Sequence, residues 1–216
     1  MVPEYRYKYV LFDFDGVIAD TEESNARYLE KALNFYQIKL TDADRRKLIG
    51  TSDQSCLMDL LKKADADVSL EQLQARRRQI GNTYENGDIG PFPGVVHYIT
   101  QLRESGRKTA LVTSTSTRLI ITILNRMHMT NLFDVIMCGD MCQTSKPDPT
   151  IYLKAMAFLG ASPQDCLVIE DSEVGIRAGK NAGATVLAFH GSNVTQDTHE
   201  ADYQADTYDA VCQLNL

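Results

Sequence analysis

Short runs of apolar residues recur along the chain, and most of the stretches between them show helical spacing. The apolar runs cover residues 10–12, 109–113, 135–138, 166–169 and 185–189, and their length is typical of buried β-strands. In residues 95–105 apolar side chains recur at helical spacing up to Gly106, and residues 118–127, 150–159 and 172–182 behave alike. Strands that alternate with helices predict an α/β fold, with a Rossmann-like parallel sheet covered on both faces.

Residues 21–90 interrupt this alternation. They contain almost no strand-like run, and their pattern predicts helices over 22–36, 42–49, 53–64 and 70–86. We therefore expect a helical cap at 21–90, inserted into a catalytic core formed by residues 1–20 and 91–216. The expected hinges are Asp20-Thr21 and residues 88–94, where Gly and Pro cluster.

Composition narrows the class of protein. Hydrophobic residues make up 44% of the 216 residues and charged residues 24%, which is the balance of a globular protein that can bury a sizeable core. The formal charge of −7 argues against nucleic acid or an anionic membrane as a partner, but a locally cationic site can still bind a small phosphorylated metabolite. The charged first nine residues do not resemble a signal peptide, and no apolar run approaches the ~20 residues of a membrane span. We therefore expect a cytoplasmic protein.

Two pairs of acidic residues lie directly after predicted strands. Asp13 and Asp15 follow the first strand, with Gly16 allowing the chain to turn, and Glu170 and Asp171 follow the fourth. Ligands of parallel α/β sheets bind beyond the carboxyl ends of the strands. Carboxylates brought together there repel each other unless a cation or a shared proton compensates. Because magnesium prefers a few carboxylates together with phosphate oxygens and water, these four residues predict a Mg²⁺ site.

Two further motifs supply groups that can bind a phosphate. Thr113-Ser114-Thr115-Ser116 follows the second strand and offers hydroxyls and backbone amides at a strand-to-helix junction, although Ser and Thr also cap helices. Lys146 precedes Pro147, which biases the lysine towards an extended backbone. This could aim one ammonium at the site, whereas an isolated lysine is usually a solvated side chain.

Taken in order, these four motifs resemble those of the haloacid dehalogenase superfamily, and the resemblance covers nearly the whole chain. The matching segments are Asp13-Phe14-Asp15-Gly16-Val17-Ile18-Ala19-Asp20-Thr21, Thr113-Ser114, Lys146-Pro147 and Glu170-Asp171. The helical insert after the first motif, and the segment 170–179, are similar to the β-phosphoglucomutase-like branch.

The resemblance implies a role for each acidic residue. Asp13 attacks phosphorus and becomes an aspartyl phosphate. Asp15 protonates the leaving oxygen and then deprotonates the water that cleaves the intermediate. Mg²⁺ lies between the Asp13 carboxylate, the Asp15 backbone carbonyl and Asp171, with Glu170 on the metal or just behind its ligands. An acid at position 15 favours phosphoryl transfer over dehalogenation, because a leaving halide needs no proton.

By the same resemblance, Thr113, Ser114 and Lys146 bind the phosphoryl oxygens of the substrate and stabilise the charge of the transition state. Together, these roles predict a magnesium-dependent phosphatase that hydrolyses a small phosphorylated metabolite, with a sugar phosphate as the first guess.

Two positions depart from the mutases of this branch. Asn25 stands where those enzymes have a hinge histidine, and Asp53 stands in the cap loop where an arginine binds a second phosphate. These differences favour the phosphatase, and a β-phosphoglucomutase-type isomerase remains the alternative. A non-catalytic phosphometabolite-binding protein is a third reading, against which the presence of nucleophile and acid together argues. The arginine run 76–78 is expected to form a solvated helix face.

Overall fold

The computed structural model describes residues 6–41, 43–44, 54–64, 67–192 and 196–216. The chain forms two compact units, one of Met1–Asp20 and Gly90–Leu216 and the other of Thr21–Ile89. These limits lie within one residue of those expected from the sequence. The role of the smaller unit as a cap stays a prediction.

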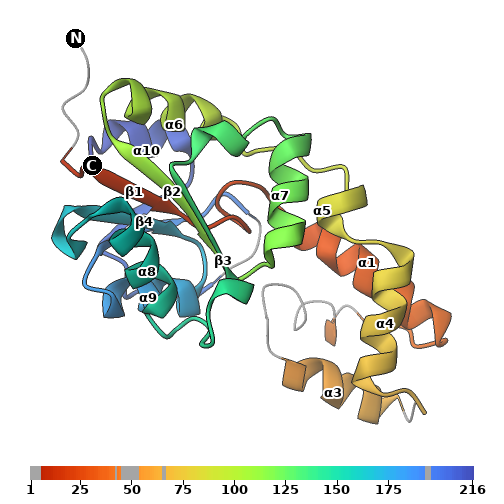
Figure 1. Cartoon of the computed structure of the whole chain (residues 1–216). Helices are drawn as coiled ribbons and strands as arrows, with labels where there is room; N and C mark the ends of the chain where they lie inside the picture. Colours follow the sequence, from red (N-terminus) through yellow and green to blue (C-terminus); the bar gives the residue numbers. More distant parts are fainter. Residues whose placement is uncertain (1–5, 42, 45–53, 65–66, 193–195) are drawn as a thin grey trace. The chain divides into compact units, whose positions relative to one another are not determined.

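A six-stranded, all-parallel sheet forms the centre of the larger unit, with the strand order β3-β2-β1-β4-β5-β6 (Figure 1). The Rossmann-like parallel sheet that the sequence predicts is thereby confirmed, with one strand more than the five apolar runs. The strands are β1 (Tyr9–Phe12), β2 (Lys108–Thr113), β3 (Val135–Cys138), β4 (Cys166–Glu170), β5 (Thr185–Phe189) and β6 (Tyr203–Ala205).

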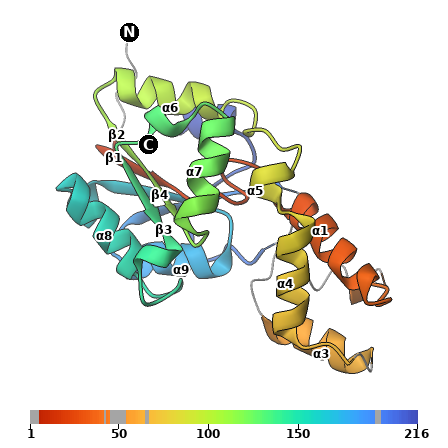
Figure 2. The same ribbon diagram turned by 45° about the vertical axis from the view of Figure 1, so that its right-hand side comes forward.

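Helices cover both faces of this sheet, with α8 and α9 on one face and α6 and α10 on the other (Figures 1 and 2). The helices of the larger unit are α6 (Val95–Glu104), α7 (Thr117–Arg126), α8 (Thr150–Leu159), α9 (Glu173–Asn181) and α10 (Tyr208–Gln213). Short 3-10 turns lie at η1 (Thr130–Leu132), η2 (Gly139–Met141) and η3 (Pro163–Asp165).

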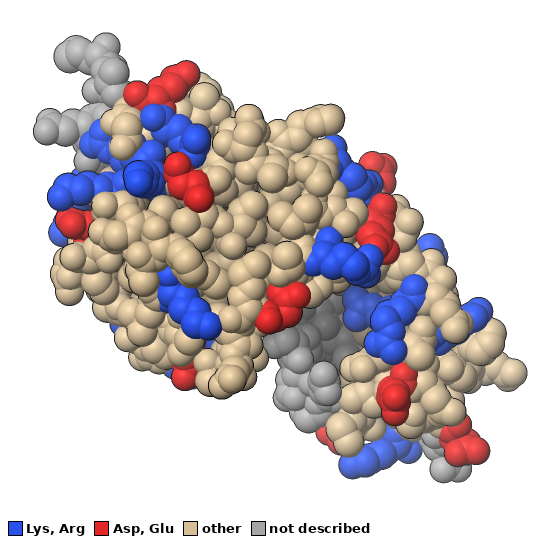
Figure 3. All heavy atoms as spheres, in the orientation of Figure 1, with Lys and Arg blue, Asp and Glu red and all other residues tan. Residues whose placement is uncertain are grey.

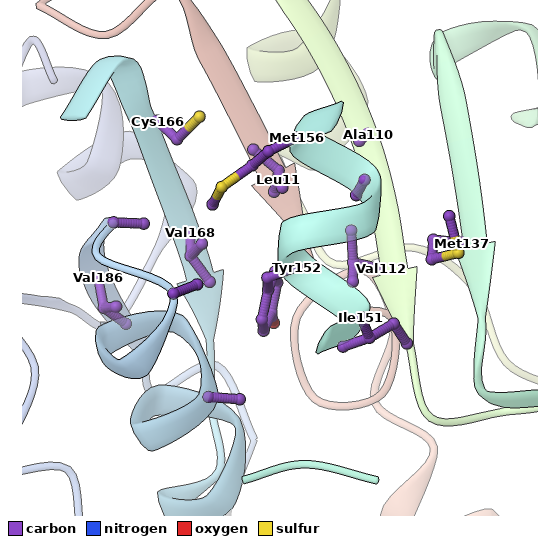
Figure 4. Close-up of a cluster of buried hydrophobic side chains, with 14 of the residues drawn as sticks. Leu11, Ala110, Val112, Met137, Ile151, Tyr152, Met156, Cys166, Val168 and Val186 are labelled. Carbon is purple, nitrogen blue, oxygen red and sulfur yellow. The ribbon is translucent and has the colours of Figure 1, made fainter. Parts of the chain in front are cut away.

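The core of the larger unit lies on both faces of β1 and its neighbours. Successive side chains of a strand point to opposite faces. Leu11, Val112 and Val168 pack with side chains of α8 and α9, as Figure 4 shows. Phe12 is completely buried on the other face, where its ring meets the edge of Tyr98 from α6. Because burying one large apolar side chain stabilises a fold by about 1.5–3 kcal/mol, this core holds the end of β1 in place.

The smaller unit is helical, and it consists of α1 (Glu22–Phe35), α3 (Gln54–Lys63), α4 (Leu70–Ile80) and α5 (Thr83–Asn86) among the residues described. Its core is formed by Ala32, Leu33, Ile38, Leu60, Leu61 and Leu73. Ser69 and Gln72 begin α4 with a capping box, in which each side chain accepts a hydrogen bond from the other residue's backbone amide.

The prediction of one helix over 70–86 is wrong. The chain leaves the helix at Gly81, which has a φ of +119°, and Asn82 then caps α5 by accepting a hydrogen bond from the Glu85 amide at 2.9 Å. Of the predicted helix over 42–49, all but two residues lie outside the described part of the chain.

Charged side chains of both signs are interspersed on the face of the molecule shown in Figure 3. Within the ranges described, no helix combines the length and the apolar character needed to cross a membrane.

Candidate active site

Three strand ends bring the predicted site residues of the larger unit to one edge of the sheet. β1 lies between β2 and β4, and Phe12 is in register with Leu111 and Ile169. Asp13 is the first residue after β1, while Thr113 and Glu170 are the last residues of β2 and β4. The carboxyl ends of neighbouring parallel strands therefore place these side chains close together, as the sequence predicts.

Lys146 contacts the ends of all three strands. Its Nζ donates to Oδ1 of Asp13 at 2.6 Å, to Oε1 of Glu170 at 2.5 Å and to the Val112 carbonyl at 3.2 Å. Only 5% of the Lys146 side chain is exposed. Lys146 is therefore a buried cation between two carboxylates rather than a solvated side chain, which leaves its predicted contact with phosphate as a proposal.

The ionisation of this group is strongly perturbed. Burial raises the pKa of Asp13 to about 8; the charge of Lys146 opposes this shift, and the charges of Glu170 and Asp15 add to it. Burial disfavours the charged ammonium of Lys146, but the carboxylates of Asp13 and Glu170 outweigh it and hold the lysine pKa well above its usual range. Lys146 is therefore charged, whereas the raised pKa of Asp13 means that this group loses its proton only near pH 8 unless a further cation stabilises the carboxylate.

A tight loop after Asp13 fixes the position of Asp15. The amides of Ile18 and Ala19 both donate to the Phe14 carbonyl, at 2.9 and 3.2 Å, and Gly16 adopts a left-handed backbone with a φ of +74°. On this loop Asp15 is half-buried, and its Oδ2 accepts a hydrogen bond from the Thr115 hydroxyl at 2.9 Å. Two carboxylates of the first motif thus sit in different environments, which suits two chemical roles.

Three carboxylates lie close enough to share a cation. Asp13, Glu170 and Asp171 each have an oxygen within 4.8 Å of the others. Carboxylate oxygens are the hard ligands that Mg²⁺ prefers, so the donor set fits this ion. The Asp15 carboxylate does not belong to this group among the residues described, and the expected contribution of the Asp15 backbone carbonyl to metal binding stays a prediction.

Thr113 ends β2, and Ser114 begins the turn that follows. Thr113 is buried, and its hydroxyl accepts a hydrogen bond from the Thr115 amide at 3.1 Å, whereas Ser114 is exposed. The segment after β3 packs against this turn so closely that a Cβ at Gly139 would lie 2.2 Å from the Ser114 carbonyl oxygen. The turn is therefore held in place, while its binding of phosphate stays a prediction.

Sequence reasoning missed the roles of two residues in this network. Thr115 bonds Asp15 across 100 residues of chain. The hydroxyl of Tyr152, in α8, donates to Oε1 of Glu170 at 2.7 Å. Thr115 belongs to a motif that the sequence flags as a whole, but Tyr152 lies at a core position of a helix, and its spacing resembles that of any buried aromatic residue.

Asn25, one of the two positions expected to differ from the mutases, belongs to the smaller unit. Asn25 is half-buried, and its Oδ1 accepts hydrogen bonds from the Thr83 hydroxyl at 2.8 Å and from Nη2 of Arg77 at 3.5 Å. The expectation of a solvated arginine face is therefore wrong for Arg77, which is half-buried. Asp53 lies outside the described residues.

Comparison with known proteins agrees with this geometry. A family model described as "Haloacid dehalogenase-like hydrolase" matches residues 10–189. The phosphorylated carbohydrates phosphatase of Thermotoga maritima is 31% identical over 174 residues, which cover 81% of each chain. The phosphoglycolate phosphatase of Aquifex aeolicus is 30% identical over 184 residues, which cover 84% of each chain.

A solved structure gives the same result. A Thermotoga maritima protein assigned as a β-phosphoglucomutase has a TM-score of 0.77 and 26% identity, and the match covers 96% of this chain and 98% of that one. Since the family model and the relatives each span most of the chain, the protein belongs to the haloacid dehalogenase-like hydrolase family, and its structural match places it in the β-phosphoglucomutase-like branch.

Proposed function

We propose that the protein is a magnesium-dependent phosphatase that hydrolyses a small phosphorylated metabolite, with a sugar phosphate as the first candidate. One observation carries this proposal: the buried carboxyl group of Asp13 lies beside the buried ammonium of Lys146 and close to two other carboxyl groups, those of Glu170 and Asp171. In addition, Asp15 is held by Thr115 on the loop that follows Asp13. Relatives described as phosphatases of phosphorylated carbohydrates and of phosphoglycolate support the substrate class.

The carboxylates supply the ligands for the metal. Asp13 and Asp171 would hold Mg²⁺ together with the Asp15 carbonyl, and Glu170 would lie directly behind them, because both of its oxygens already accept hydrogen bonds. When bound, Mg²⁺ offsets the repulsion between the Asp13 carboxylate and the phosphate.

Phosphoryl transfer would proceed in two steps on the chain's own residues. In the first, an oxygen of Asp13 forms a bond to phosphorus, the ester P–O bond breaks, and Asp15 gives its proton to the leaving oxygen. In the second, Asp15 takes a proton from water, which attacks the phosphoaspartate and releases inorganic phosphate. Lys146, Thr113 and Ser114 would bind the equatorial oxygens, where negative charge develops.

The environment of Asn25 favours hydrolysis over isomerisation. A mutase must keep water away from its phosphoenzyme until the sugar returns, and this requires a closure coupled to the correct substrate. Asn25 stands at the position of the hinge histidine, and its carboxamide oxygen is bonded to Thr83 and Arg77 within the smaller unit. A carboxamide cannot take up and release a proton as a histidine does, so Asn25 cannot provide the control that a hinge histidine would. We therefore expect water to be the main acceptor of the phosphoryl group.

A metabolite panel with a nucleophile variant tests this proposal. Purified protein with Mg²⁺ should release phosphate from at least one sugar phosphate, and Asp13→Asn should abolish turnover because the amide has nearly the same shape but is a poor nucleophile. Asp165→Asn, which changes a half-buried carboxylate at the surface near the start of β4, should leave turnover unchanged.

Two product measurements complete the test. Mass spectrometry of the trapped intermediate should place phosphate on Asp13, and phosphate on another residue would refute the assignment of the nucleophile. If the protein converts β-glucose 1-phosphate to glucose 6-phosphate faster than it releases phosphate, the choice of phosphatase over mutase is wrong.

A further inference from the structure

Tyr152 lies in the first turn of α8 and is completely buried. Figure 4 shows it among the apolar side chains between α8 and the sheet. Its ring belongs to this hydrophobic cluster, and a phenylalanine ring would fill the same space. The hydroxyl sets Tyr152 apart, because it donates to Oε1 of Glu170 at 2.7 Å. Buried polar groups need a partner, and here the partner belongs to the proposed active site.

Donors surround both oxygens of Glu170. Oε1 accepts from the Tyr152 hydroxyl and from Nζ of Lys146, at 2.7 and 2.5 Å. Oε2 accepts from the Ser172 hydroxyl and the Asp171 amide, both at 3.2 Å, and from the Ser172 amide at 3.5 Å. A carboxylate offers about four acceptor positions, so these five donors fill its capacity. Glu170 is therefore fixed in one orientation.

The segment that follows reinforces this orientation. Gly175 in α9 approaches the carboxylate so closely that a Cβ there would lie 2.0 Å from Oε1 of Glu170. The carboxylate is thus confined between α9, α8 and Lys146, and a change in one donor must be taken up by the others.

The orientation of Glu170 determines where the ammonium of Lys146 lies. Nζ is shared between Oε1 of Glu170 and Oδ1 of Asp13, which is 2.6 Å away. Among the described residues, Tyr152 and Lys146 are the donors to Oε1, so removal of the Tyr152 hydroxyl would leave Lys146 as its donor. Oε1 would then bind the ammonium more strongly, and the ammonium would be drawn away from Asp13.

We propose that Tyr152 is a positioning residue for phosphoryl transfer: its hydroxyl shares Oε1 of Glu170 with Lys146 and thereby keeps the ammonium beside Asp13. This inference rests on the proposed phosphatase function. Tyr152 acts on Asp13 through Glu170 and Lys146. Mutation of a residue that hydrogen-bonds to the side chains of a metal site typically lowers activity or metal affinity by about 10- to 100-fold.

A pair of tyrosine variants tests the role of the hydroxyl. Tyr152→Phe removes the hydroxyl and keeps the ring. Tyr7→Phe is the matched control, because Tyr7 is buried in the same unit and its hydroxyl donates to Oγ1 of Thr185, at the start of β5, at 2.8 Å. With saturating Mg²⁺ and substrate, kcat should fall about 10- to 100-fold in Tyr152→Phe and less than about twofold in Tyr7→Phe. An equal loss in both variants, or no loss in Tyr152→Phe, overturns the proposal.

The position of the ammonium can also be measured without turnover. The ¹⁵N resonance of the Lys146 ammonium should shift in Tyr152→Phe and stay unchanged in Tyr7→Phe, with and without Mg²⁺. If the wild-type protein hydrolyses no phosphate ester, the proposed function fails, and this spectrum still decides the role of Tyr152. Incorporation of 3-fluorotyrosine at position 152 keeps the hydroxyl, so it should preserve the Lys146 resonance and turnover even if Tyr152→Phe does not fold. An unchanged Lys146 resonance in Tyr152→Phe, or loss of turnover with 3-fluorotyrosine, overturns the proposal.

Discussion

Gly16→Ala is the sharpest single test of the candidate active site, because one methyl group meets two separate constraints. Gly16 has a φ of +74°, a left-handed conformation that an L-residue with a Cβ adopts at a cost of about 1–2 kcal/mol. For a chain of this length, that loss lowers Tm by about 2–8 °C. The backbone alone therefore predicts a modest loss of stability.

The second constraint concerns Asp171. A Cβ at Gly16 would lie 1.9 Å from Oδ2 of Asp171, about 1.5 Å closer than the 3.4 Å at which ordinary van der Waals contact begins. Metal ligands are placed to within about 0.2 Å, so the required shift exceeds the tolerance of a metal site several-fold. We expect the Mg²⁺ affinity to fall at least about 10-fold, which corresponds to about 1.4 kcal/mol.

Gly106→Ala separates the two constraints. Gly106 also has a positive φ, +81°, but nothing lies within 4 Å of its Cβ position. In the presence of a chelator, Gly16→Ala should lose at least as much stability as Gly106→Ala, because only its Cβ meets another side chain. Only Gly16→Ala should need more Mg²⁺, in activity assays and in thermal-shift titrations. A Mg²⁺ dependence of Gly16→Ala equal to that of Gly106→Ala would show that Asp171 does not hold the metal in the position inferred here.

Three other expectations follow from the same contacts. Activity should vanish with excess chelator and return with Mg²⁺, and full turnover in chelator would contradict the metal site. Lys146→Met leaves two buried carboxylates facing each other, so the free energy of unfolding should fall by about 3–5 kcal/mol in denaturant titrations. As a control, Lys180→Met removes a surface ion pair with Asp202 and should change the free energy of unfolding by less than about 1 kcal/mol. Equal effects of the two substitutions would mean that the burial of Lys146 does not contribute to stability. Gly139→Ala should weaken the binding of inorganic phosphate in calorimetry, because the added Cβ would displace the Ser114 carbonyl. Unchanged binding would show that the turn at Ser114 does not contact the phosphate.

The strands of the core could be predicted because each is a short apolar run buried on both faces of a parallel sheet. β6 escaped prediction because Tyr203–Ala205 is only three residues long, with a polar residue at its centre, and lies at the sheet edge, where it pairs with β5 alone. The break between α4 and α5 escaped because the apolar spacing continues across it. The signal that could have located it is Gly81-Asn82, a helix-ending glycine followed by a capping residue.

The acidic residues of the site could be predicted because parallel strands end together, so a motif after one strand meets motifs after its neighbours. Contacts made by helices do not follow this rule. Tyr152 meets Glu170 because α8 packs on the sheet at one particular rotation, and nothing in its local sequence distinguishes its hydroxyl from its ring. Thr115 likewise acquires its contact with Asp15 only from the way in which two turns pack.

Charge links the metal to the chemistry. The protein carries a formal charge of −7, and its candidate site gathers three carboxylates within 4.8 Å of one another. Lys146 cannot draw in a phosphate by itself, because Asp13 and Glu170 already share its ammonium at 2.6 and 2.5 Å. A phosphate dianion approaching these residues meets a net negative charge unless a divalent cation neutralises the cluster. In the proposed mechanism, magnesium binding and attack by Asp13 would be two consequences of one arrangement of charges, and a result that removes either would also remove the main reason for proposing the other.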